Sequence, residues 1–168
     1  APTDHARPLN KRGRRDAPKV GVALAERGWV PELVLSSDSQ RTRETWAGLA
    51  TALGEGAEVH FTPVLYHAGM GGLQALLADV PEDVHTVLAL GHNPGWEMVV
   101  GWLSGVDTVM KTSSAALLTS QAASQTLPGI EYRINKIGLA FQFGTDIFQG
   151  FELFLPVGLV YLEAGDTL

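Results

Sequence analysis

Short apolar runs alternate with amphipathic stretches over the first two-thirds of the chain. The apolar runs predict buried strands, and the amphipathic stretches predict helices. Helices are predicted from Asn10 to about Arg27 and over residues 40–53, 70–78 and 96–103, and strands over residues 33–35, 58–62, 84–90 and 115–119. Because strands and helices alternate, the pattern predicts an α/β fold with three layers, in which a mostly parallel sheet carries helices on both faces.

Capping residues and helix breakers mark the ends of these elements. Asn10 is a suitable N-cap for the first helix, and Pro18 is expected to kink that helix or to mark its true first turn. Ser36 to Ser39 form a polar group that is expected to cap the second helix. Gly28 and Gly54 follow two of the predicted helices and are expected to end them.

The pattern changes after Gln121. Residues 122–129 show no clear periodicity and are expected to form a loop, and three β-rich runs follow without an intervening helix, at 137–143, 151–155 and 157–162. We therefore divide the chain into an α/β domain at 1–121 and a β-rich tail at 122–168, which is expected to pack on the same domain. Uncovered strands favour a neighbour, so the tail is also a candidate surface for a protein partner.

Composition limits the classes of protein to consider. The chain has 168 residues, of which 45% are hydrophobic and 18% charged, which is typical of a globular domain. It contains no cysteine, which excludes a thiolate nucleophile and thiolate metal ligands. No segment reaches the roughly 18 apolar residues of a membrane span.

Basic residues gather near the start of the chain although the formal net charge is −6. Residues 1–43 hold nine Lys or Arg residues and five acids, and the densest group is the run from Lys11 to Arg15. This run is interpreted as a solvated helix face, with a polyanion site as the alternative. No aromatic residue lies among these charges, so a nucleic acid is not the expected partner.

A polar segment follows each of two predicted parallel strands. Ligands of such sheets bind at this position, beyond the carboxyl ends of the strands. Arg41 lies in the first turn of a predicted helix, where the free N–H groups and the helix dipole favour an anion. His92 lies where an apolar strand breaks into a turn, and its imidazole can act as acid or base near neutral pH. Together they predict an oxyanion pair; the alternative is a surface ion pair of Arg41 or Arg43 with an acid such as Glu44, beside a structural histidine.

Other common sites have no support in the sequence. The remaining histidines, His5, His60, His67 and His85, show no metal-ligand spacing, so no metal is expected. No glycine-rich nucleotide loop occurs, and no cofactor is expected. The four tryptophans, Trp29, Trp46, Trp96 and Trp102, are expected in or beside the core, and the wall of the cleft beside His92 is an alternative place for Trp96.

Five motifs in order resemble the histidine phosphatase superfamily, and more narrowly its small phosphohistidine-phosphatase branch of the plant and algal type. They are Arg7–Pro8–Leu9–Asn10–Lys11–Arg12–Gly13, Leu33–Val34–Leu35–Ser36–Ser37, Arg41–Thr42–Arg43–Glu44–Thr45, Leu65–Tyr66 and Leu90–Gly91–His92–Asn93–Pro94–Gly95–Trp96–Glu97. The resemblance covers residues 7–121. It implies hydrolysis of phosphohistidine or a phosphomonoester through a phosphohistidine intermediate, without a metal, and a phosphorylated protein or small phosphate ester as substrate.

The same resemblance implies roles for individual residues. Arg41 corresponds to a phosphate-binding arginine, and His92 to the second histidine, which is catalytic and also holds the phosphoryl group. Arg7 is expected to bind phosphate at the substrate groove. These roles are physically consistent, because arginines and imidazoles stabilise the charge of a phosphoryl group in transfer. The plant and algal type implies an intracellular protein, with chloroplast and mitochondrion both open as the compartment.

One departure from the family pattern concerns the nucleophile. The family carries it in an Arg-His-Gly or Arg-His-Ala motif after its central first strand, and these 168 residues contain no Arg-His pair. Three explanations stay open: a shortened form of an active phosphatase, an inactive pseudophosphatase that acts as a structural or interaction subunit, or a first strand supplied by the tail. In the third case Gly158–Leu162 would be the central strand, with Glu163–Ala164 at the position of Arg-His.

Overall fold

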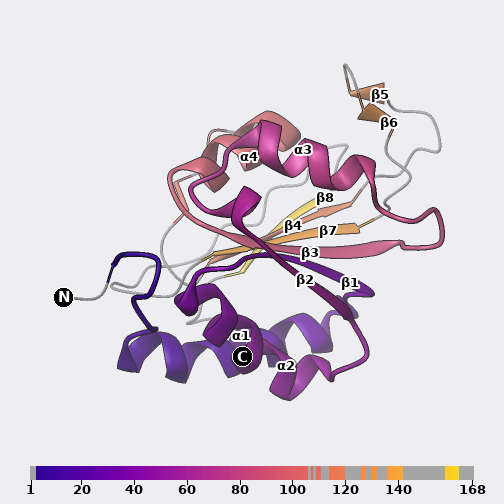
Figure 1. The fold of residues 1–168 in the computed structure, drawn as a ribbon. Helices are drawn as coiled ribbons and strands as arrows, with labels where there is room; N and C mark the ends of the chain where they lie inside the picture. The colour runs from indigo at the N-terminus through magenta and orange to yellow at the C-terminus, as the bar shows by residue number, and fades with distance from the viewer. Residues whose placement is uncertain are drawn as a thin grey trace.

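A sheet between two pairs of helices forms the protein, which is described from a computed structural model (Figure 1). The structure describes residues 3–105, 107, 109–110, 114–119, 126–127, 130–131, 136–141 and 158–162. The helices are α1 (Lys11–Glu26), α2 (Gln40–Leu53), α3 (Met70–Ala78) and α4 (Gly95–Ser104), with a short 3₁₀ helix η1 (Pro63–Leu65). The strands are β1 (Leu33–Ser37), β2 (Glu58–Thr62), β3 (Thr86–Gly91), β4 (Ala115–Thr119), β5 (Thr126–Leu127), β6 (Ile130–Glu131), β7 (Lys136–Phe141) and β8 (Gly158–Leu162).

The main sheet has the strand order β2-β1-β3-β7-β4-β8. The first three neighbouring pairs, from β2 to β7, are parallel, and the last two pairs are antiparallel. This arrangement confirms the predicted α/β fold with a mostly parallel sheet. It also shows that β7, from the segment assigned to the tail, inserts between β3 and β4 of the α/β domain.

The hypothesis that Gly158–Leu162 is the central strand is wrong. Among the strands that the structure describes, β8 lies at the edge of the sheet and pairs with β4 alone, antiparallel, with Leu162 opposite Ala115. The parallel position beside β3 belongs to β7, with Gly91 opposite Phe141. Apolar composition alone does not distinguish these places, because pairing depends on neighbours far away in the sequence.

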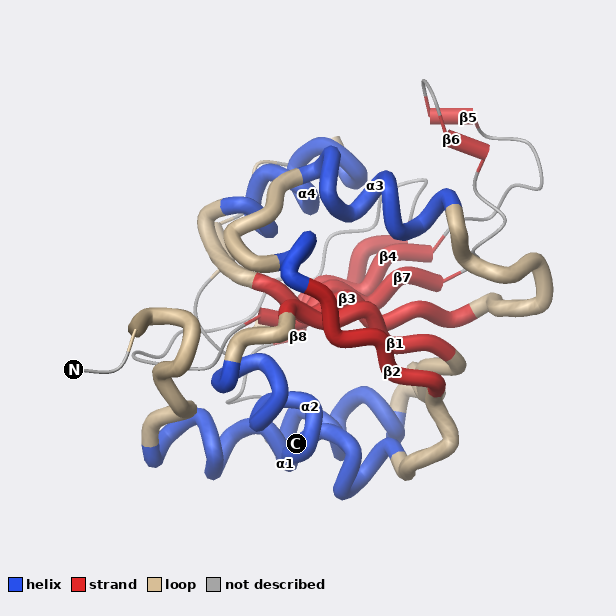
Figure 2. The backbone as a smooth tube through the Cα atoms, viewed as in Figure 1, coloured by secondary structure: helices blue, strands red, loops and turns tan. Residues whose placement is uncertain are grey.

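The two faces of the sheet are covered by different helix pairs (Figure 2). Successive side chains of a strand point to opposite faces, so β1 contributes Val34 to one core and Leu33 and Leu35 to the other. Helices α1 and α2 pack on the Val34 side, and α3 and α4 pack on the opposite side. The predicted helices on both faces are therefore confirmed.

Several element ends differ in detail from the prediction. Helix α1 begins at Lys11, with the Asn10 side chain accepting from the Gly13 N–H, and continues through Pro18. Strand β1 includes Ser36 and Ser37, which were expected to be capping residues. Both serines are fully buried, and this is tolerated because their hydroxyls are hydrogen-bonded.

Predictions for the segment after Gln121 and for Trp102 also differ from the structure. The predicted loop at 122–129 contains β5, which pairs with β6, and the predicted strand at 151–155 lies outside the described residues. Trp102 is 42% exposed rather than part of the core. No helix in the described part of the chain is long and apolar enough to span a membrane.

Candidate functional site

Polar side chains gather at the carboxyl edge of the parallel strands. β1 ends at Ser37 and leads into α2, β3 ends at Gly91 and is followed by His92, and β2 ends at Thr62 and leads through η1 to Tyr66. Because β1, β2 and β3 run parallel in register, these three exits lie beside one another. This is the place where ligands of open α/β sheets bind.

Arg41 and His92 form the buried part of the site. Arg41 is 2% exposed and His92 is 1% exposed, and the Arg41 Nη2 lies 3.2 Å from the His92 Nδ1. A guanidinium only donates, so the His92 Nδ1 accepts and its ring proton is on Nε2. That Nε2–H donates to the Ser37 Oγ over 2.9 Å. Strand β1 therefore orients the imidazole, and helix α2 positions the arginine in its first turn.

The rest of the Arg41 guanidinium faces the segment that precedes α1. Its Nη1 donates to the Asp4 backbone carbonyl over 2.6 Å, and its Nη2 lies 3.1 Å from the Asp4 Oδ2. The Arg41 Nε is buried and has no hydrogen-bond acceptor among the residues that the structure describes. A buried N–H without an acceptor is costly, and the oxygen of a bound anion would satisfy it.

The Asp4 carboxylate is also bound by Tyr66 and Arg7. The Tyr66 hydroxyl donates to its Oδ2 over 2.8 Å, and the Arg7 Nη2 lies 3.0 Å from its Oδ1. The Tyr66 hydroxyl has the largest effect on the Asp4 pKa, and with Arg41 and Arg7 it holds that pKa below its usual value. The same hydrogen bond raises the pKa of Tyr66 above its ordinary value, assisted by burial of the phenol.

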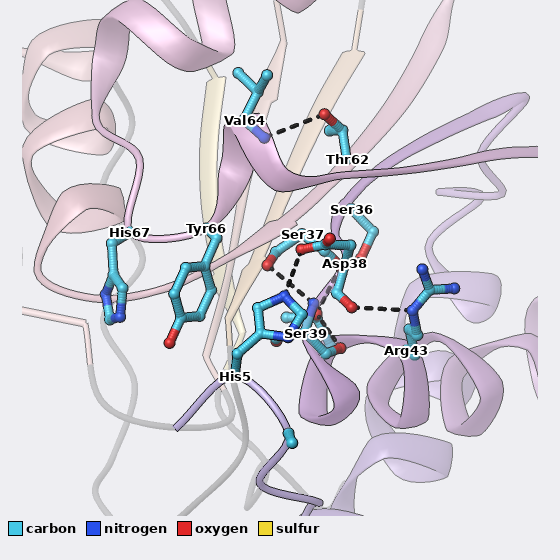
Figure 3. A network of polar contacts seen from close by, with 12 residues as sticks. His5, Ser36, Ser37, Asp38, Ser39, Arg43, Thr62, Val64, Tyr66 and His67 are labelled. Atoms are coloured by element: carbon cyan, nitrogen blue, oxygen red, sulfur yellow. Dashed lines mark hydrogen bonds and ion pairs between the residues drawn. The ribbon is translucent and has the colours of Figure 1, made fainter. Parts of the chain in front are cut away.

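Aromatic rings form one wall of the site (Figure 3). Tyr66 lies between His5 and His67, with its ring centroid 4.8 Å and 4.2 Å from theirs, and 5.3 Å from that of His92. The His5 Nε2 lies 2.7 Å from the Asp38 Oδ1, just after β1. The His5 carbonyl accepts from the Gln40 N–H, which holds the N-terminal segment against the start of α2.

A match to a known family supports this arrangement. Residues 4–111, nearly two-thirds of the chain, match the model of the histidine phosphatase superfamily (branch 1). The chain belongs to the histidine phosphatase superfamily. The matched residues include β1, β2, β3 and all four helices, and thus every side chain described above at the carboxyl edge.

Sequence relatives and solved structures agree with this membership. An uncharacterised chloroplastic protein of Arabidopsis thaliana is 43% identical over 125 residues, which cover 68% of this chain and 57% of that protein. An uncharacterised protein of Mycobacterium tuberculosis is 32% identical over 110 residues, which cover 64% of this chain and 67% of that protein. The chain therefore spans somewhat more than half of the length of the plant relative.

The structural neighbours are SixA phosphatases. The protein histidine phosphatase SixA, solved in complex with tungstate, has a TM-score of 0.61 and 27% identity, covering 71% of this chain and 79% of its own. A SixA protein of Agrobacterium tumefaciens, assigned as a phosphohistidine phosphatase, has a TM-score of 0.59 and 29% identity, covering 64% of this chain and 68% of its own. The chain is thus of the SixA-like branch, as its motifs suggest.

The structure brings together two of the predicted residues and links the third to them. Arg41 and His92 are in contact, and Arg7 reaches them through Asp4. Glu44 pairs with Arg14 rather than with Arg41 or Arg43. Trp96 does not line the cleft, because it is fully buried in the core between the sheet and α4.

Four residues of the site were not singled out from the sequence. Ser37 was expected only as a capping residue, and Tyr66 only as a residue of a family motif. His67 was considered only as a metal ligand, for which its spacing is unsuitable. Asp4 lies in a short polar turn with no periodicity. Among the residues that the structure describes, no group of three or more His, Cys, Asp or Glu side chains could hold a metal ion.

Proposed function

We propose that this chain binds the phosphoryl group of a phosphohistidine or phosphomonoester between Arg41 and His92. The observation that carries the proposal is the buried contact of the two side chains, 3.2 Å apart, beside an Arg41 Nε with no acceptor among the described residues. Arginine presents a planar fork that suits phosphate oxygens. When an anion binds, protonation at Nδ1 would turn His92 from an acceptor into a second donor.

The proposed reaction is that of the family. A nucleophilic histidine attacks phosphorus, the P–N or P–O bond to the leaving group breaks, and water then hydrolyses the phosphohistidine. Arg41 and His92 would stabilise the charge on the phosphoryl oxygens in both steps, and Arg7 would bind at the rim. SixA is a protein histidine phosphatase, which favours a phosphorylated protein as the substrate.

The nucleophile is the part of the reaction that the 168 residues do not supply, because they contain no Arg-His pair. His5 lies near the site, but it is paired with Asp38 and its side chain is 43% exposed. We therefore expect this chain to bind phosphate without turning over substrate, and a longer chain that adds an Arg-His strand to be active. The alternative is a pseudophosphatase that serves as a structural or interaction subunit.

The basic run near the N-terminus is the weakest alternative site. Arg12 and Arg15 both pair with Asp16, which is 2% exposed, and Arg14 pairs with Glu44. Ion pairs within the chain compete with an external polyanion for these cations. The structure thus favours the solvated-face interpretation over a polyanion site.

Calorimetric titration with inorganic phosphate or tungstate tests the proposal. Arg41→Ala should abolish binding, and Arg43→Ala is the matched control, because it removes the same charge two residues along α2 from an exposed position. Equal binding by wild type and Arg41→Ala would refute the phosphate site. Hydrolysis of a phosphohistidine peptide by the 168-residue chain, lost in His92→Ala, would refute the expected lack of turnover.

A further inference from the structure

The carboxylate of Asp4 lies where donors from three separate segments converge. Its Oδ2 is 3.1 Å from the Arg41 Nη2, 2.8 Å from the Tyr66 hydroxyl and 3.7 Å from the His67 Nε2. Its Oδ1 is 3.0 Å from the Arg7 Nη2. These groups come from α2, from the loop after β2 and from the segment before α1. Such convergence on one anionic group resembles an anion site that the chain fills with its own side chain.

This position adjoins the buried pair described above. The Arg41 Nη2 contacts both the Asp4 carboxylate and the His92 Nδ1, and the His67 and His92 ring centroids are 5.5 Å apart. A phosphoryl group held by Arg41 and His92 would therefore place one of its oxygens close to the Asp4 Oδ2. Carboxylate and phosphoryl oxygens accept the same hydrogen bonds, so the same donors serve both.

Charge favours the external anion. Two arginines, Arg41 and Arg7, contact one carboxylate, which leaves an excess of positive charge at this point. A phosphoryl dianion would neutralise both arginines, whereas the Asp4 monoanion neutralises one. The Asp4 side chain is 48% exposed on a short turn, so it has room to leave.

The backbone of His67 is a second, independent observation. Its φ is 54°, in the left-handed region that residues with a Cβ rarely adopt. Such outliers gather at functional sites, where the surrounding structure maintains them. Here the unusual conformation accompanies a ring that lies against Tyr66 (Figure 3). The same ring lies next to His92, and the His67 side chain is 57% exposed.

We propose that Tyr66 and His67 are further phosphate-binding residues, and that Asp4 occupies their phosphoryl-oxygen position until substrate displaces it. The inference rests on the proposed function, because it extends the Arg41–His92 pocket outward. It assigns Tyr66 as a hydrogen-bond donor to the bound group and His67 as a donor at its exposed side. Asp4, which is anionic at neutral pH, acts as an internal competitor.

Two substitutions with opposite expected effects test this proposal. Asp4→Asn removes the competing charge and should tighten binding of inorganic phosphate by roughly three- to tenfold, whereas Tyr66→Phe removes one donor and should weaken it by a similar factor. His67→Gly removes the ring and relaxes the backbone, so it should weaken binding without loss of thermal stability. Calorimetry on the 168-residue chain measures all three.

A purely structural role of Asp4 predicts the reverse pattern. If Asp4 only holds Arg41 in place, Asp4→Asn will weaken phosphate binding and Tyr66→Phe will leave it unchanged, and either result overturns the inference. Binding that Arg41→Ala abolishes, with no gain in Asp4→Asn, would keep the proposed function and reject the competitor. Phosphate binding by neither wild type nor Asp4→Asn would reject both.

Discussion

The candidate site has two halves that differ in how the fold holds them. The inner half consists of Ser37, Arg41 and His92, which are all at most 2% exposed. The outer half consists of Asp4, Tyr66 and His67, which lie on loops and are partly or largely exposed. The inner residues lie at or next to the ends of buried strands and at the start of a packed helix, whereas the outer ones are held by side-chain contacts with one another and with the inner residues.

This difference suggests a division of labour. A buried guanidinium and imidazole keep their geometry without a ligand, which is the preorganisation that charge stabilisation requires. Exposed side chains on loops can exchange partners, which the proposed displacement of Asp4 requires. The inner half would therefore determine whether a phosphoryl group binds. The outer half would determine how strongly that group must compete with the Asp4 carboxylate.

The largest expected effect concerns the packing of the turn after His92 against the loop that carries Tyr66 and His67. A Cβ on Gly95, after the His92 turn, would lie 1.9 Å from the Ala68 carbonyl oxygen, next to His67. Gly95→Ala should therefore destabilise the protein by about 3 kcal/mol and displace the outer loop. Urea unfolding measures the change. Gly71→Ala is the control, because a Cβ there meets nothing within 4 Å. Equal stability of Gly95→Ala and wild type would show that the Ala68 carbonyl does not pack against Gly95.

An intermediate effect separates the roles of two neighbouring serines. The Ser37 Oγ accepts from the His92 Nε2–H, whereas the Ser36 Oγ donates to the Ser37 carbonyl. Each change to alanine should cost about 1 kcal/mol of stability, because a buried hydrogen bond is lost. Only Ser37→Ala should also weaken phosphate binding, by roughly fivefold, because the imidazole loses an orienting partner. Calorimetric titration with inorganic phosphate measures the affinity of both variants. Equal affinities would show that Ser37 does not contribute to phosphate binding.

The inner half is also the half that the sequence predicted. Arg41 and His92 follow apolar runs that indicate buried strands, and the carboxyl ends of parallel strands meet at one edge. Asp4 gave no such signal, because a short polar turn has no period, and its importance comes from contacts with residues up to 63 positions away. The roles of Tyr66 and His67 likewise depend on Asp4 and were not visible from either motif or spacing.

The fold shows the same limit. The helices and the strands of the first 119 residues were predicted with small errors at their ends, because local periodicity determines them. The strand order was not predicted. In the structure β7 enters between β3 and β4, and β8 lies at the edge of the described sheet. These positions follow from pairing between distant segments, which composition does not encode.

The smallest expected effect is a shift in the titration of one phenol in the outer half. The hydrogen bond to the Asp4 carboxylate raises the Tyr66 pKa above its ordinary value of 10.0, because it stabilises the protonated phenol. Its contribution to stability is therefore present below that value and is lost as pH rises through the raised pKa. Asp4→Asn should lower the Tyr66 pKa toward its ordinary value.

Absorbance titration of tyrosinate measures the Tyr66 pKa. Because the chain has three tyrosines, the titration curve of Tyr66→Phe is subtracted to isolate the signal of Tyr66. Glu58→Gln is the control, since it removes the same charge at the opposite end of β2, where Glu58 pairs with His60. An unchanged Tyr66 pKa in Asp4→Asn would show that the Asp4 contact does not form in solution. Inorganic phosphate added to Asp4→Asn should raise the pKa again, because a bound phosphoryl oxygen would replace the lost carboxylate as the acceptor for the Tyr66 hydroxyl.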